Sequence, residues 1–124
     1  MQKIFILSIL TILFIVSCLG SSENIDIVKN GSFYSYPDIT VGKMVNTIFE
    51  KVNWEEIIAD DGNSYVNMYG YTEDDDEILI QFRIKYNEDN WEKYWEVNAM
   101  EMNGEPATTR WIANDLYDLY IANK

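Results

Sequence analysis

The amino-acid sequence predicts an α+β fold, a two-layer domain in which a helix, a four-stranded antiparallel meander and a C-terminal helix follow one another. Three observations predict it. Apolar residues after Thr40 recur with a helical period, apolar residues occupy every second position from Ile78 to Tyr86, and a second helical pattern ends the chain. Short Asp-, Asn- and Gly-rich loops separate the strand-like runs and indicate hairpins.

The first helix is predicted from Val41 to Val52, where the apolar residues lie on one helical face and charged or polar residues on the other. Thr40 precedes it and can accept a hydrogen bond from a free backbone N–H as the N-cap. The pattern is typical of a helix packed on a sheet, and a helix that binds a partner is the alternative.

The four strands are predicted at Trp54–Ala59, Tyr65–Tyr71, Glu77–Tyr86 and Trp91–Met102. In the fourth strand, Trp95, Val97 and Ala99 are expected to face inward. Met100 and Met102 break this alternation, which indicates a β-bulge.

The C-terminal helix is predicted after residues 103–106, with Thr108 as its cap. Its apolar positions are Trp111, Ile112, Leu116, Leu119 and Tyr120.

The amino terminus has the layout of a secretory signal peptide. Lys3 precedes an uncharged apolar run, Ile4–Val16, and Ser17-Cys18 supplies a junction of small residues. A membrane-spanning helix needs about 20 apolar residues. The shorter run therefore favours a cleaved signal over residues 1–17.

The junction Ile15-Val16-Ser17-Cys18 resembles the lipobox of bacterial lipoproteins. The resemblance implies that Cys18 receives a diacylglyceryl thioether, that cleavage occurs before it, and that a fatty acid such as palmitate is added to the new amino group. Two or more acyl chains anchor a protein stably to a membrane. The expected location is the bacterial cell envelope; an ordinary signal peptide with an incidental cysteine, or an uncleaved anchor, is the alternative.

Residues 18–36 are small, polar and turn-rich, which predicts a flexible tether between the lipidated cysteine and a single domain over residues 37–124. A short edge strand at Ile25, Ile27 and Val28 is the alternative. The stretch Tyr36-Pro-Asp-Ile-Thr-Val-Gly42 resembles the Tyr-Pro-x-x-Thr-Ile/Val-Gly start of small envelope lipoproteins of unknown function. That resemblance implies a fold and a location but no catalytic residues.

The charge of the chain limits its partners. The formal net charge is −12, and removal of residues 1–17 takes away Lys3 and no acid, which leaves −13. Nucleic acid is an unsuitable partner because phosphate neutralisation needs clustered Lys and Arg. Anionic headgroups would be repelled, so the lipid on Cys18 is the expected membrane contact, and cationic proteins would be attracted.

The sequence contains no histidine and a single cysteine. Ser-His-Asp and Cys-His catalysis and the usual zinc sites are thereby excluded. We expect no enzymatic activity and no cofactor.

The most acidic stretch, Glu73–Glu77, lacks the alternating acids and central glycine of an EF-hand loop. It is predicted to be a solvated turn with no metal, and a weak cation site is the alternative. The acids of the first and third turns, Asp60, Asp61, Glu88 and Asp89, are expected at one end of the sheet.

Tyr65, Tyr69 and Tyr71 share one face of the second strand, opposite Val66 and Met68. If the tyrosines are exposed, they form a candidate binding face with two residues of the third strand, Gln81 and Arg83. The alternative is a core that uses tyrosine with its hydroxyl at the boundary.

Two functions follow as hypotheses. One is an anchored lipoprotein that binds or scaffolds another protein without catalysis. The other is an acidic inhibitor or sequestering factor for a cationic extracellular protein such as a lysozyme or an antimicrobial peptide.

Overall fold

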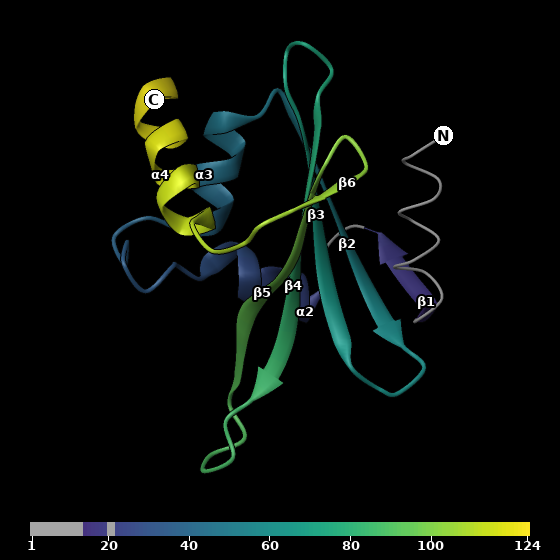
Figure 1. Cartoon of the computed structure of the whole chain (residues 1–124). Helices are drawn as coiled ribbons and strands as arrows, with labels where there is room; N and C mark the ends of the chain where they lie inside the picture. The colour runs from purple at the N-terminus through teal and green to yellow at the C-terminus, as the bar shows by residue number, and fades with distance from the viewer. Residues whose placement is uncertain (1–13, 20–21) are drawn as a thin grey trace.

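The computed structural model describes residues 14–19 and 22–124, and these residues form an α+β domain (Figure 1). One antiparallel sheet has the strand order β1-β2-β3-β4-β5-β6. The helices of the described residues pack on one of its faces (Figure 1). In chain order the elements are β1 (Phe14–Leu19), α2 (Glu23–Asn30), α3 (Val41–Ile48), β2 (Lys51–Ala59), β3 (Ser64–Tyr71), β4 (Glu77–Tyr86), β5 (Lys93–Met102), β6 (Glu105–Ala107) and α4 (Ile112–Asn123).

The predicted meander is confirmed as strands β2 to β5, and the predicted bulge lies in β5. Gln81 pairs with Ala99, but Phe82 pairs with Val97, so Asn98 is the extra residue. The bulge turns Met100 toward the helices, where it packs against the core. The expectation that Ala99 faces inward is therefore wrong, because Ala99 follows the extra residue.

The segment predicted as a flexible tether folds from Ser22 onward. Ser22 caps α2 by accepting a hydrogen bond from the Ile25 backbone N–H at 3.1 Å. Ile25 and Val28 lie one turn apart on this helix and are fully buried in the core. The domain consequently begins before residue 37, and α2 replaces the proposed edge strand.

Polar contacts fix α2 to the sheet. The Asn24 side chain donates a hydrogen bond to Glu56 of β2 and accepts one from Lys93 of β5 at 3.0 Å. Lys93 also forms an ion pair with Glu23 at 3.2 Å. Because these contacts join α2 to two strands, the helix is part of the domain.

Helix α3 begins where it was predicted but ends four residues earlier. The Thr40 hydroxyl accepts a hydrogen bond from the Lys43 N–H at 3.1 Å, which confirms the predicted cap. After Ile48 the backbone becomes extended, so Val52 belongs to β2. The Phe49 ring then lies over Gly70 of β3, where an added Cβ would come within 2.6 Å of the ring.

An Asn-Gly turn follows β5 and forms a further hairpin. Asn103 and Gly104 both have positive φ angles, 52° and 84°, as a two-residue type I′ turn requires. Strand β6 follows the turn and pairs with the end of β5. The Thr108 cap is wrong, because the helix begins later, at Ile112, and Trp111 is its N-cap without a side-chain hydrogen bond.

Strand β1 pairs antiparallel with β2, from Phe14 opposite Ala59 to Leu19 opposite Glu55. Cys18 lies in this strand, opposite Glu56. The rest of the predicted signal peptide, residues 1–13, lies outside the described residues.

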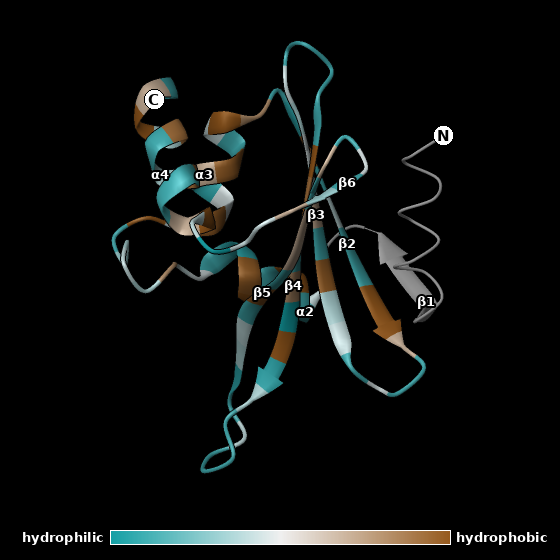
Figure 2. Ribbon diagram, in the orientation of Figure 1, coloured by the Kyte–Doolittle hydropathy of each residue, from teal (hydrophilic) through white to brown (hydrophobic). Residues whose placement is uncertain are grey.

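The core lies between the helices and the sheet. Hydrophobic positions occur in α3 and α4, whereas the hairpin turns are hydrophilic (Figure 2). The fully buried side chains come from both layers and include Ile25, Val28, Val41, Met44, Val45, Val66, Met68, Ile80 and Phe82.

Candidate functional site

The candidate site is the sheet face opposite the helices, which we call the outer face. Tyr65, Tyr69 and Tyr71 of β3 point to it, because Val66 and Met68 between them are in the core on the helix side. Across the ladder, Tyr65 pairs with Arg83 and Tyr69 with Leu79. The structure thus brings the predicted tyrosines beside β4.

One polar residue from each of β2 to β5 forms a row across the middle of the outer face. Glu55 pairs with Asn67, and Asn67 pairs with Gln81. Asn98, the bulge residue, donates a hydrogen bond to Gln81 Oε1 at 2.6 Å. Sequence reasoning missed this row except for Gln81, although the parity of Asn67 with the tyrosines could have indicated it.

The outer face is more buried than an open docking surface. Asn67 is 0% exposed, Leu79 4% and Gln81 5%, whereas the three tyrosines are half-buried. Gln81 therefore offers little contact area to a partner. The tyrosines fit neither sequence alternative fully, since they belong to no core cluster and are also not fully exposed.

Tyr69 is tied into this polar network. Its hydroxyl donates to Glu55 Oε1 at 3.2 Å and accepts from Asn67 Nδ2 at 3.3 Å. Burial raises the pKa of Tyr69 to about 12; the hydrogen bond from Asn67 lowers it, and the carboxylates of Glu55 and Glu77 raise it further. Burial, followed by a hydrogen bond to Glu77, also raises the pKa of Tyr71 to about 12. Both phenols are therefore neutral at physiological pH.

Two buried polar atoms of the outer face have no hydrogen-bond partner among the described residues. They are Oδ1 of Asn67, an acceptor, and Nε of Arg83, a donor. A buried polar atom without a partner destabilises a fold by about 1–3 kcal/mol. Both atoms are inaccessible to solvent in the folded chain, so a bound group could reach them only after a local rearrangement of this face.

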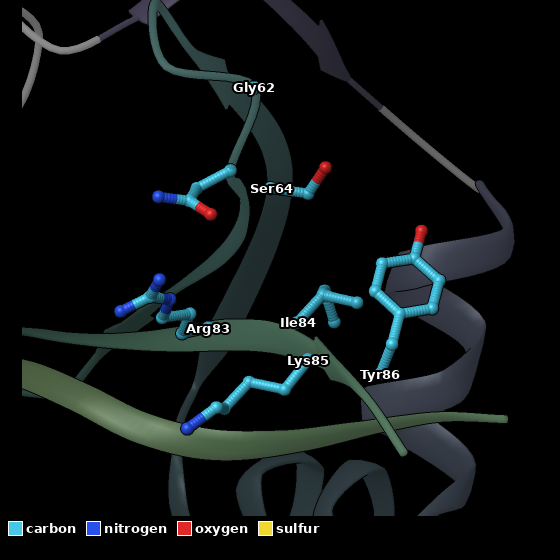
Figure 3. Close-up of a pocket in the computed structure, with 7 residues that line it drawn as sticks. Gly62, Ser64, Arg83, Ile84, Lys85 and Tyr86 are labelled. Atoms are coloured by element: carbon cyan, nitrogen blue, oxygen red, sulfur yellow. The ribbon is translucent and has the colours of Figure 1, made fainter. Parts of the chain in front are cut away.

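Arg83 also lines a small pocket of about 220 Å³ beside the β2–β3 turn. Figure 3 shows Arg83 and Lys85 extending from one side of β4, while Ile84 and Tyr86 extend from the other. Lys85 is paired with Glu96 at 3.3 Å. Glu96 is also the ladder partner of Arg83, so one carboxylate lies beside both cations.

The acidic turns form no metal centre in the part of the chain that the structure describes. No group of three or more acidic or cysteine side chains there could hold a metal ion. The acids of residues 73–76 are exposed, and the turns that carry Asp60, Asp61, Glu88 and Asp89 lie at one end of the meander on separate hairpins (Figure 1).

The helices formed by the described residues are too short and too polar to cross a membrane. The chain matches no protein family model, no curated protein and no solved structure.

Proposed function

We propose that this protein is a lipid-anchored lipoprotein of the bacterial envelope that binds another protein through its outer face and catalyses no reaction. The observation that carries the proposal is the pair of unpartnered buried atoms, Asn67 Oδ1 and Arg83 Nε, beside half-buried tyrosines. A partner that donates to the one and accepts from the other would remove the free-energy penalty of both.

The side chains of the outer face indicate which groups its partner would present. Arg83 favours a carboxylate or a backbone carbonyl, because its guanidinium presents several donors in a fixed geometry. Tyr65 and Tyr71 supply amphipathic contact area with few rotatable bonds, as aromatic anchors do at interfaces. The partner is therefore expected to present an acceptor group next to an apolar patch.

The absence of histidine from the sequence supports a non-enzymatic function, because no side chain has an ordinary pKa close to neutral pH. The tyrosines of the outer face do not replace it, since the pKa values of Tyr69 and Tyr71 are about 12.

The anchor is proposed from the junction Ile15-Val16-Ser17-Cys18. Cys18→Ser should leave an unlipidated precursor that keeps residues 1–17 and lacks the acyl mass. Mass spectrometry of the mature amino terminus tests this directly. A wild-type protein that begins at another residue and carries no acyl mass would contradict the anchor.

The binding face can be tested by photo-crosslinking in the cells that make the protein. A photoreactive amino acid in place of Tyr65 should give a discrete adduct, whereas the same replacement of Tyr34, which is 97% exposed in a loop, should not. Arg83→Gln should weaken the Tyr65 adduct without lowering the melting temperature. Equal adducts at positions 65 and 34 would contradict a specific partner at the outer face.

A further inference from the structure

A groove of about 690 Å³ lies between α4, the end of α3 and the β3–β4 turn. Its volume is in the range of sites that hold small ligands or the side chains of a peptide. No residue of the outer face lines it. Its lining comes from α3 and the residues after it, the β3–β4 turn, β4, β5 and α4.

The floor of the groove is apolar and partly open to solvent. Ile112 and Leu116 of α4 are buried and form its base together with Ile78 of β4. Met102 and Leu119 also line it, yet they are 48% and 47% exposed. Burial of such side chains by a ligand would be favourable by about 25 cal/mol for each Å² of apolar surface.

The rim of the groove is acidic. Five exposed carboxylates line it, and no Lys or Arg does. They come from three segments: the residues between α3 and β2, the β3–β4 turn and α4. In Figure 2 the β3–β4 turn is hydrophilic, while the nearby ends of α3 and α4 contain hydrophobic positions. The five residues are Glu50, Glu73, Asp74, Asp76 and Asp115.

We propose that this groove binds a cationic amphipathic peptide, with its apolar side chains on the floor and its Lys or Arg residues against the acidic rim. The negative charge of the rim and of the whole chain favours this ligand over negatively charged ones. A second copy of the chain, at −12, would be repelled, as would nucleic acid and anionic lipid. The site is separate from the outer face, so the two proposals can fail independently.

The lining fits a helical ligand. An amphipathic helix places anchors at i, i+3, i+4 and i+7 on one face, which suits a groove with an apolar floor. Met100 and Met102 have flexible, polarisable side chains that adapt to ligands of different shape. Lys and Arg can flank the apolar face of such a helix and reach carboxylates on both sides.

The binding test uses the full chain in vesicles of zwitterionic phosphatidylcholine, with empty vesicles as the background. The probe is a fluorescent leucine–lysine peptide of about 14 residues, four turns of amphipathic helix, and anisotropy reports binding. A peptide of the same composition with scrambled order has the same charge but no apolar face. We expect the amphipathic peptide to bind at least about tenfold more tightly, because only it can fill the floor.

Two pairs of substitutions locate the site. Glu73→Gln with Asp74→Asn removes two of the five rim charges and should weaken binding about three- to tenfold at low salt. Glu88→Gln with Asp89→Asn makes the same change of net charge on the exposed β4–β5 turn and should leave binding nearly unchanged. Leu119→Ser should weaken binding while the circular dichroism spectrum stays the same, since this side chain is half exposed.

Three results would overturn the proposal. These are equal binding of the scrambled peptide, equal weakening by the two pairs of substitutions, and full binding by Leu119→Ser. Each would mean that the peptide is attracted by net charge alone. Arg83→Gln tests the outer face separately and is expected to leave binding of this peptide unchanged.

Discussion

The two faces of the central strands are buried to a similar extent, but apolar side chains are buried on one face and polar side chains on the other. Met68 and Asn67 are neighbours on β3, and each is 0% exposed. Met68 joins the apolar core beneath the helices, where Phe82 packs edge-on against Trp95 with ring centroids 5.2 Å apart. Asn67 is buried among polar side chains of the outer face and keeps an acceptor without a partner.

The difference shows that equal burial does not mean equal contribution to stability. An apolar side chain gains free energy wherever it leaves water. A polar side chain gains only if its hydrogen bonds are replaced, and an unpaired atom destabilises the fold. Burial on the helix side therefore stabilises the domain, whereas burial on the outer face leaves two polar atoms without a hydrogen bond among the described residues.

The largest expected effect is on the helix side. Phe82→Ala should lower the free energy of unfolding by about 3–5 kcal/mol, because it opens a cavity at a fully buried position. Its neighbour on the outer face, Gln81, loses only the hydrogen bond to Asn98 when changed to Ala, about 1 kcal/mol. Urea unfolding of both variants measures the two losses in the free energy of unfolding. Losses of similar size would contradict the proposed difference between the two faces.

The second prediction concerns alkaline pH. Since the pKa of Tyr69 is about 12 in the folded protein and 10.0 ordinarily, the folded state holds the proton more tightly. This contribution is fully present below pH 10 and is lost as pH rises toward 12. Because Tyr69 is partly exposed, we expect the free energy of unfolding to fall by about 1 kcal/mol over this range.

Tyr69→Phe is the control for this titration, because it removes the phenol and keeps the ring. Lysine residues titrate in the same range in both proteins, so only the difference between the two is informative. A decline of the same size in Tyr69→Phe would show that the outer-face phenol is not responsible.

The smallest expected effect is an increase in stability. Asn67→Val removes the buried unpaired acceptor and keeps a side chain suited to a strand, so stability should rise by about 0.5–1 kcal/mol. The Tyr65 photo-adduct should weaken at the same time, because a contact to the partner is lost. A loss of stability together with an intact adduct would indicate that Asn67 has only a structural role.

Local signals explain which parts of the fold could be predicted. The Thr40 cap, the strand over residues 77–86 and the broken period near Met100 each lie within a few residues, and all three are confirmed. Burial along this strand does not alternate, however, because Leu79 and Gln81 on its outer side are buried as well. Helix α2 was missed because its eight residues carry only two fully buried apolar positions, although Ser22 is a recognisable cap. Strand β6 was missed although Asn103-Gly104 is a strong hairpin signal.

The candidate sites depended more on tertiary structure. The odd-numbered positions of Tyr65, Tyr69 and Tyr71 predicted that they share one face, because the alternation of side chains along a strand is a local property. The burial of Asn67 and the missing partner of Arg83 depend on four strands at once. The groove depends on how α4 meets the β3–β4 turn, which no short sequence pattern specifies.

The pairing of β1 with β2 has a consequence for the timing of maturation. A cut before Cys18 would remove Phe14–Ser17, four of the six residues of β1. A peptidase needs this stretch unpaired, whereas the strand ladder holds it against Ile57 and its neighbours. If the chain is cut before Cys18, processing and folding would compete for the same backbone, and a chain that folds first would be protected from the cut. In a chain that is cut first, the edge of β2 would be left open to the backbone of another molecule.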